Sequence, residues 1–140
     1  MVYFFKKIAH FLTANSRHGT HSPFVYALAD QLIYNKRIDR SDSLITDIIR
    51  YYNDIGITDE LFLVTDFCEF SIDELSDLQG QYFMIFIKNI HAAGNLKKWN
   101  AMQSDERFIV LIDLFEFGIV CKRKEQPKET FKLRYPYHFY

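Results

Sequence analysis

The sequence predicts a single α/β domain in which helices precede a small sheet. Three short apolar runs are separated by segments with helical spacing, the pattern of parallel strands joined by helical crossovers. The last apolar runs add an antiparallel hairpin. A chain of 140 residues suits one core. We divide it into a helical part, residues 1–56, and an α/β part, residues 57–140.

The composition is that of an ordinary globular protein, with 49% apolar and 25% charged residues. The net charge of −1 creates no overall field that would attract nucleic acid or an acidic membrane. No apolar run approaches the roughly 18 residues of a membrane span. The charged residues of the N-terminal segment follow its first apolar residues, unlike those of a signal peptide. The two cysteines of the chain, Cys68 and Cys121, lie far apart and lack metal-ligand spacing. We therefore expect free thiols in a reducing compartment. We therefore expect a cytoplasmic protein without a membrane partner.

Three helices are expected in the N-terminal part. The second begins at Ser22, a good N-cap, with Pro23 at the first helical position. The third ends at Gly56, which suits the C′ position. The first helix has an apolar stripe that consists of Phe4, Phe5, Ile8, Phe11 and Leu12. The apolar face of the third consists of Leu44, Ile45, Ile48, Ile49, Tyr52 and Ile55.

The α/β part begins with residues 61–67, an apolar run typical of a strand that is buried on both faces. Ser71 and Glu74 form a capping box, which predicts a short helix before Gly80. Residues 82–87 predict a second strand.

A helix is expected over residues 91–103, with Leu96, Trp99 and Met102 facing inward. Residues 108–115 predict a third strand, followed by a tight turn at Gly118. The fourth and fifth strands are expected over residues 118–123 and 130–135.

Two segments of the chain are similar to a known family. Residues 17–34, "RHGTHSPFVYALADQLIY", are similar to a stretch near the start of its members. "KNIHAAGNLKKW" and "IVLIDLFEFGIVCKRKEQPKETFKLRY", within residues 88–135, are similar to their C-terminal third. The chain thus resembles class I S-adenosylmethionine-dependent methyltransferases of Bacteroidetes type. Members are longer between the two segments, so the resemblance implies a Rossmann-like sheet reduced from seven strands to about five.

The stretch "VTDFCEFS", residues 64–71, resembles the first strand and cofactor loop of that family, whose pattern is Asp-Phe-Gly-x-Gly-Ser. Cys68 and Phe70 stand in the places of the two glycines. The side chain of Phe70 fills space that a close backbone approach to a nucleotide requires. Glu69 places a negative charge at the N-terminus of the next helix. We expect no bound S-adenosylmethionine at this degenerate loop, which comprises Asp66, Phe67, Cys68, Glu69 and Phe70.

The end of the second strand also departs from the family. In related metal-dependent O-methyltransferases an acid–Asn pair here helps to bind a divalent cation, whereas this chain has Lys88 and Asn89. A lysine ammonium repels Mg²⁺, so we expect no metal site. His91 is close to the start of the next helix and is a weak candidate for a catalytic base. A lone histidine without a partner acid is more often structural.

A possible pocket comprises His18, His21, Lys88, Asn89 and His91. The first two could bind metal, but no further ligand lies nearby in the sequence, so a structural role is favoured.

Three other features invite a functional reading. Asp113 lies in an otherwise apolar strand and needs a hydrogen-bond partner if it is buried. Cys68 could be reactive at a helix N-terminus, although its flanking phenylalanines predict burial and Glu69 opposes the thiolate. The basic residues of 121–134 come without a nucleic-acid-binding motif, so nucleic acid is not an expected partner.

These patterns favour a shortened, non-catalytic methyltransferase-like protein that acts by binding a protein or a small molecule. The alternative is an S-adenosylmethionine-dependent methyltransferase, active alone or only with a partner, and a nucleic-acid-binding module is a third possibility. Shortening a seven-stranded sheet leaves a strand edge uncovered, which invites association. We therefore expect a homodimer with the first strand or the first and third helices at the contact.

Overall fold

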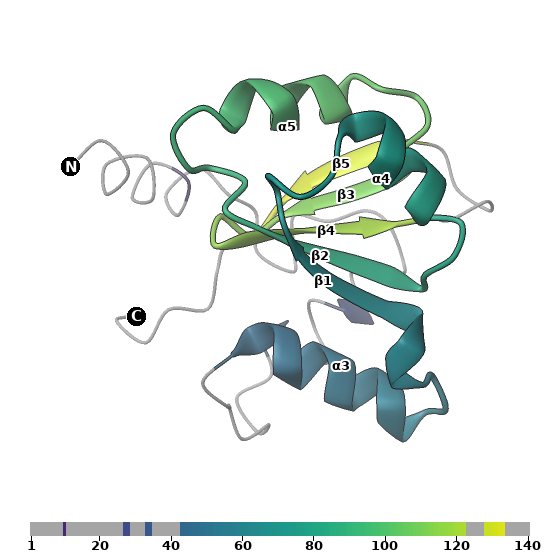
Figure 1. The fold of residues 1–140 in the computed structure, drawn as a ribbon. Coiled ribbons are helices and arrows are strands. Elements are labelled where there is room, and N and C mark those ends of the chain that lie inside the picture. Colours follow the sequence, from purple (N-terminus) through teal and green to yellow (C-terminus); the bar gives the residue numbers. More distant parts are fainter. Residues whose placement is uncertain (1–9, 11–26, 29–32, 35–42, 123–127, 134–140) are drawn as a thin grey trace.

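The computed structural model describes residue 10 and residues 27–28, 33–34, 43–122 and 128–133. A five-stranded sheet lies between α3 on one face and α4 and α5 on the other (Figure 1). None of the helices in this part of the chain combines the length and the apolar character that a membrane crossing requires. The elements are α3 (Leu44–Asp54), a 3-10 helix (Asp59–Leu61), β1 (Phe62–Asp66), α4 (Ile72–Leu78), β2 (Met84–Lys88), α5 (Leu96–Gln103), β3 (Val110–Asp113), β4 (Phe117–Cys121) and β5 (Glu129–Lys132).

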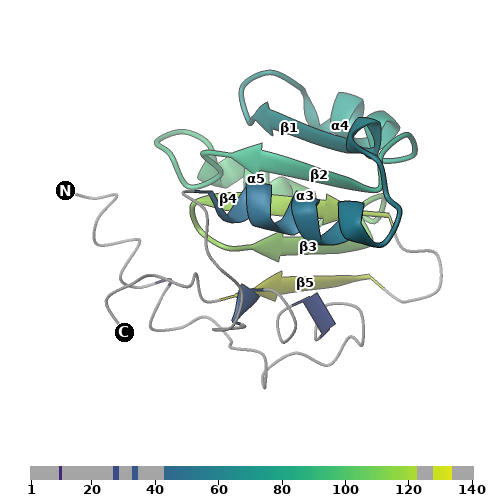
Figure 2. The ribbon, with the colours of Figure 1, turned by 90° about the horizontal axis from the view of Figure 1, so that it is seen from below.

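The strand order is β1-β2-β4-β3-β5, with β1 and β5 at the two edges of the described sheet (Figure 2). β1 is parallel to β2, β5 is parallel to β3, and β4 is antiparallel to both β2 and β3. Four strands therefore run in one direction and β4 runs in the other. The predicted α/β class with a mixed sheet of five strands is confirmed.

The antiparallel hairpin consists of β3 and β4, and β5 does not extend it. The short turn after Asp113 returns the chain beside β3, where Leu114 N–H donates to the carbonyl of Phe117 at 3.0 Å. The other edge of β4 then pairs with β2. β2 and β3 are parallel as expected, but β4 lies between them.

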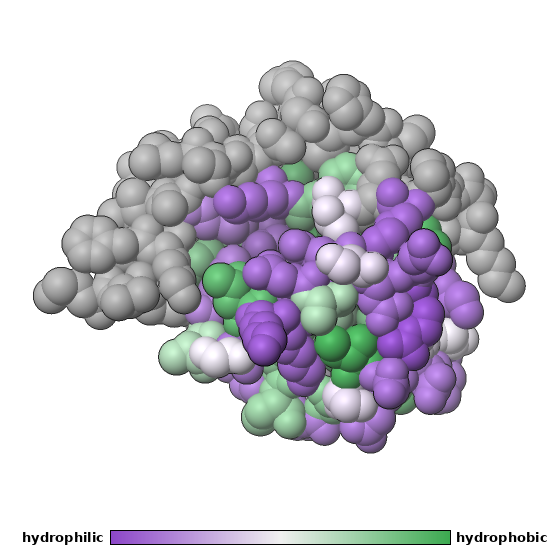
Figure 3. Space-filling model, turned by 90° about the horizontal axis from the view of Figure 1, so that it is seen from above, coloured by the Kyte–Doolittle hydropathy of each residue, from purple (hydrophilic) through white to green (hydrophobic). Residues whose placement is uncertain are grey.

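The core has one apolar layer on each face of the sheet, and β2 shows the alternation. Met84 and Phe86 pack in the layer that contains the buried residues of α3. Ile85 and Ile87 pack in the layer that contains Leu75 of α4 together with Trp99 and Met102 of α5. Successive residues of a strand point to opposite faces, so one continuous apolar run fills both layers. The predicted inward positions of Trp99 and Met102 are confirmed, while Leu96 is only partly buried. Seen from above, the surface of the described residues is largely hydrophilic, with hydrophobic residues in small separate groups (Figure 3).

α3 has the start and stop that its sequence predicts. Thr46 N–H donates to Oγ of Ser43, and Gly56 has φ 101°, a left-handed conformation that glycine adopts easily. Ile55 is 64% exposed, so its predicted place on the apolar face is wrong. The helix ends at Asp54, and the chain turns away before Ile55 could face the core. The predicted stripe of the first helix and the predicted start of the second lie outside the described residues.

α4 begins with the predicted capping box. Glu74 N–H donates to Oγ of Ser71 at 3.1 Å, and Ser71 N–H donates to Oε1 of Glu74 at 3.0 Å. Two backbone donors at the helix start are thereby satisfied.

The predicted start of one helix and the predicted position of one turn are wrong. The helix expected from residue 91 begins at Leu96, because Asn89 and Gly94 take positive φ angles of 65° and 85° and hold the intervening residues in turns. Gly118 lies within β4, and the turn instead uses Phe115 at φ 70°. A Cβ on Gly118 would lie 2.6 Å from Cη2 of Trp99, so this glycine makes room for the indole ring.

Candidate functional site

A charged residue stands at the carboxyl end of each of the four parallel strands, and these four ends lie along the same side of the sheet. These are Asp66 of β1, Lys88 of β2, Asp113 of β3 and Lys132 of β5. The register pairs Asp66 with Lys88 and Asp113 with Lys132. Ligands of α/β proteins bind outside the carboxyl ends of their parallel strands. This side of the sheet is therefore the place to look for a site.

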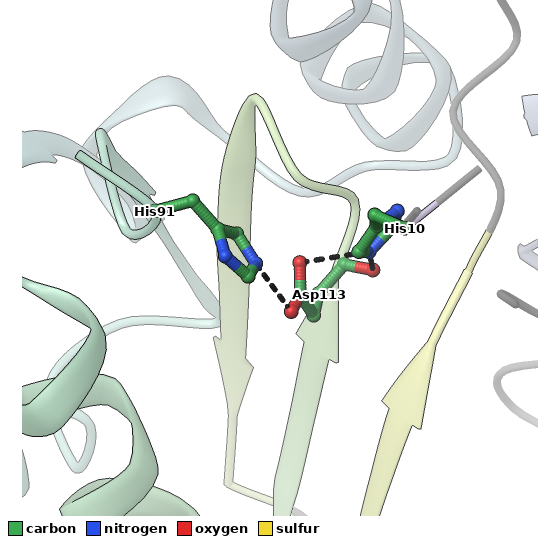
Figure 4. A group of neighbouring side chains, drawn as sticks. All are labelled: His10, His91 and Asp113. Carbon is green, nitrogen blue, oxygen red and sulfur yellow. Dashed lines mark hydrogen bonds and ion pairs between the residues drawn. The ribbon is translucent and has the colours of Figure 1, made fainter. Parts of the chain in front are cut away.

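On this side the carboxylate of Asp113 lies between two imidazole rings (Figure 4). Nε2 of His91 is 2.7 Å from Oδ2, and Nε2 of His10 is 3.1 Å from Oδ1. Phe115 N–H also donates to Oδ1, at 2.9 Å. Asp113 is only 4% exposed. The prediction that this residue needs a hydrogen-bond partner is confirmed.

The two histidines keep Asp113 ionised. Burial alone would raise the pKa of this carboxyl group, because a low dielectric disfavours the charged form. The hydrogen bonds from His10 and His91 outweigh burial and hold the pKa of Asp113 well below its usual range. The site therefore contains a buried carboxylate at neutral pH.

Phe115 packs against both imidazoles. Its ring stacks on His91 with a centroid distance of 4.5 Å and meets His10 edge-on at 5.3 Å. A positive φ is rare for a bulky residue and costs free energy, so it persists only where the surroundings fix it. Here the strained turn aims both the backbone N–H and the ring of Phe115 at the cluster.

Sequence reasoning missed this cluster. The description of His91 as a lone histidine without an acid is wrong, because Asp113 is its partner. His91 also precedes α5 rather than standing at its N-terminus. His10 was not among the predicted site residues, since it is separated from Asp113 by most of the chain. The one signal in the sequence was Asp113 itself. An acid in an apolar strand indicates that hydrogen-bond partners exist, but it does not identify them.

An open pocket of about 370 Å³ adjoins the cluster, and α5 supplies much of its wall. Trp99 is 1% exposed, and its indole Nε1 has no hydrogen-bond partner in the described part of the chain. The lining residues are His10, His91, Leu96, Trp99, Asn100, Gln103, Asp113 and Lys132.

The predicted pocket overlaps with the observed one only at His91. Lys88 and Asn89 do not line it, because Asn89 turns toward β1, where its Nδ2 donates to Oδ2 of Asp66. His18 and His21 lie outside the described residues.

The turn after β1 uses its own backbone donors. Cys68 N–H donates to Oδ1 of Asp66, and Glu69 N–H donates to the backbone carbonyl of Asp66, both at 3.1 Å. Phe67 N–H donates to the carbonyl of Lys88 at the same distance. The hydrogen bond from the backbone N–H of Cys68 lowers the pKa of Asp66, and the bond from the side chain of Asn89 has a smaller effect in the same direction.

Lys98 of α5 closes this turn from the other side. Its ammonium donates to the carbonyls of Phe67 and Phe70 and lies 4.3 Å from the ring centroid of Phe67. Burial lowers the pKa of Lys98. The turn is thus fixed by contacts with α5 as well as by its own hydrogen bonds.

The predicted burial of Cys68 is wrong. Phe67 turns inward against Trp99, and Cys68, the next residue, faces solvent. Its hydrogen bond to Asp66 and the charge of that carboxylate raise the pKa of the thiol. Exposure alone therefore does not make Cys68 a reactive thiolate.

No family model matches the chain, and neither the curated proteins nor the solved structures contain a match. Its function must therefore be argued from the site itself.

Proposed function

We propose that the chain is a shortened, non-catalytic relative of class I S-adenosylmethionine-dependent methyltransferases that binds a small molecule in the pocket beside α5. The observation that carries this proposal is an open pocket whose lining includes Trp99, a residue with a buried indole N–H that has no hydrogen-bond partner among the described residues. A buried donor without a partner costs about 1–3 kcal/mol. Because Nε1 is buried, a ligand acceptor would recover that free energy only where the side chains that cover the indole move to let it approach.

The pocket suits a small organic molecule in size and chemistry. Its volume of about 370 Å³ lies within the usual range of small-molecule sites. Leu96 and Trp99 offer apolar surface, whereas Asn100 and Gln103 offer amide groups. Lys132 and the ionised Asp113 add one charge of each sign. We therefore expect a partly apolar ligand that carries hydrogen-bond acceptors.

Two features support a role without the cofactor of the family. The backbone donors of Phe67, Cys68 and Glu69 already have partners within the protein, so they are not free to hold a nucleotide. In doubly wound sheets the cofactor loop follows a strand at the middle of the sheet, where the strand order reverses. β1 forms an edge of the described sheet instead. A methyltransferase would need its cofactor site elsewhere or from a partner.

A fragment screen followed by NMR of ¹⁵N-labelled protein, prepared with a chelator, tests the proposed pocket. Trp99 is the only tryptophan of the chain, so its indole N–H gives one assignable signal. Fragments that carry acceptors should shift this signal together with amides of α5. Asn100→Phe should weaken these hits at least about tenfold, because the new ring fills the pocket. Ala101→Phe, at the next exposed position, should not.

The proposal fails if confirmed hits leave the Trp99 indole signal unmoved. It fails equally if the hits bind Asn100→Phe and the wild-type chain with the same affinity.

A further inference from the structure

The cluster around Asp113 contains three side chains that are able to bind metal. His10 and His91 each offer an imidazole nitrogen and Asp113 offers a carboxylate oxygen, and the three atoms lie within 4.8 Å of one another. A tetrahedral ion with ligands at about 2.0–2.1 Å holds neighbouring ligand atoms roughly 3.3 Å apart. The nitrogen–oxygen distances in the cluster are 2.7 Å and 3.1 Å. The two distances run to different oxygens of Asp113, so the side chains would have to move until both Nε2 atoms and one carboxylate oxygen surround the ion.

The ligand types indicate which ions would fit. Two imidazoles and one carboxylate suit Zn²⁺ and neighbouring first-row transition ions. Mg²⁺ and Ca²⁺ prefer sites built from oxygen ligands. The ionised carboxylate of Asp113 would neutralise part of the charge of the ion.

The surroundings hold these ligands in place and leave one side open. His10 and Asp113 are 3% and 4% exposed, and the ring of Phe115 packs on both imidazoles. All three ligands also line the open pocket. Three protein ligands with an accessible remaining position is the arrangement of metal sites that bind a further ligand or water.

We propose that His10, His91 and Asp113 bind one divalent first-row transition ion through the two Nε2 atoms and a carboxylate oxygen. Each imidazole would then carry its proton on Nδ1, and the remaining coordination positions would face the pocket. In the metal-free cluster Nε2 of His91 bonds with Oδ2 of Asp113, whereas Nε2 of His10 lies 3.1 Å from Oδ1 and 3.2 Å from the backbone carbonyl oxygen of the same residue. This inference does not rest on the proposed function, because the ion would bind whether or not an organic molecule enters the pocket.

The first test is a calorimetric titration of the chelator-treated full chain with Zn²⁺ alone. Cys68→Ser serves as the background, because this exposed thiol could bind Zn²⁺ by itself. We expect one ion per chain with a Kd of about 1 μM or tighter, and no saturable binding of Mg²⁺. A Kd for Zn²⁺ weaker than about 100 μM overturns the proposal.

Variants then locate the ion. Asp113→Asn and His91→Gln should each weaken Zn²⁺ binding at least about tenfold while thermal unfolding shows that they remain folded. Asp105→Asn removes a carboxylate outside the cluster and should leave the affinity unchanged. An unchanged affinity in folded His91→Gln overturns the proposal.

A measurement on the unsubstituted ligands keeps the test decisive if the variants unfold. Bound Co²⁺ is paramagnetic, so NMR signals close to it shift or broaden strongly. The effect should centre on the residues around His91 and Asp113. A centre elsewhere in the chain contradicts the site.

Discussion

At Asp113 one buried carboxylate contacts two imidazoles and accepts a hydrogen bond from a backbone N–H. Nε2 of His10 also lies 3.2 Å from the backbone carbonyl oxygen of the same residue. These contacts join the N-terminal part, the segment after β2 and the β3–β4 turn. Removing the carboxylate would take the side-chain acceptor from Nε2 of His91 and from the Phe115 N–H, while Nε2 of His10 would keep its contact with the backbone carbonyl oxygen of Asp113.

Asp113→Ala should therefore lower the free energy of unfolding by about 3 kcal/mol, the scale of breaking a buried ionic network from one side. Urea unfolding followed by circular dichroism measures the change. Asp105→Ala is the matched control, because Asp105 bonds with solvent-exposed Arg107 and should matter much less. Equal effects of the two substitutions would contradict the structural weight assigned to Asp113.

The stabilisation from Asp113 should also depend on pH. Its pKa is lower in the folded state than the unfolded value of about 3.9. A group with a depressed folded pKa stabilises the protein above the unfolded pKa and loses this effect as pH falls toward the folded pKa. The difference in unfolding free energy between wild type and Asp113→Ala should shrink as pH falls below about 4. A difference that widens in acid would refute the sign.

Gly118 has no side chain, and the indole ring of Trp99 packs in the space that a side chain would occupy. A Cβ there would lie 2.6 Å from Cη2 of Trp99, so Gly118→Ala should destabilise the protein by about 1–3 kcal/mol and shift the fluorescence of Trp99. In Gly80→Ala the nearest atom to the new Cβ would be 3.7 Å away, so the cost should stay below about 1 kcal/mol. Thermal unfolding compares the two. Similar losses would mean that the indole can move aside.

At the level of helices and strands, sequence patterns predicted the features that depend on residues close together in the chain. The capping box before α4, the stop of α3 at Gly56 and the presence of a strand at β2 depend on neighbouring residues. The start of α5 and the position of the β3–β4 turn were misplaced, because they depend on the packing of Trp99 on Gly118 and on positive φ angles at Asn89 and Phe115. Single-sequence patterns do not contain such contacts.

The capping box gives a prediction for α4. Ser71→Ala removes the side-chain acceptor for Glu74 N–H and should cost about 1 kcal/mol. Ser76→Ala, within the same helix, should be neutral or slightly stabilising, because alanine has the higher helix propensity. Chemical denaturation of both variants checks this, and a larger loss for Ser76→Ala would rule out the cap as the cause.

At the scale of the whole molecule, sequence reasoning predicted the α/β class but not the position of β4 between β2 and β3. Strand order is set by pairing between distant segments, which periodicity does not report. The candidate site was only partly predictable for the same reason. His91 was singled out and Asp113 was expected to need partners, but His10, Asp113 and His91 come together only through the tertiary fold.

The edge strand β1 leads to a prediction about assembly. Within the described residues β1 pairs only with β2, and Val64 is 42% exposed. An apolar, unpaired edge favours association, so we expect a homodimer that buries more than about 1,000 Å². Light scattering over a range of concentrations should report twice the mass of one chain. Val64→Lys should weaken the dimer and Ala101→Lys, on α5, should not. A monomer at every concentration would show that the chain covers this edge itself.

We propose above that this chain binds a small molecule beside α5 and does not bind S-adenosylmethionine, the cofactor of the family it resembles. Calorimetric titration of the full chain with S-adenosylmethionine tests that claim most directly, in a sample whose Trp99 indole signal shows that it is folded. We expect no saturable binding with a Kd below about 100 μM, because the turn after β1 already uses its backbone donors internally. A one-to-one isotherm with a Kd below that value would show that the chain binds the cofactor and would favour a working methyltransferase.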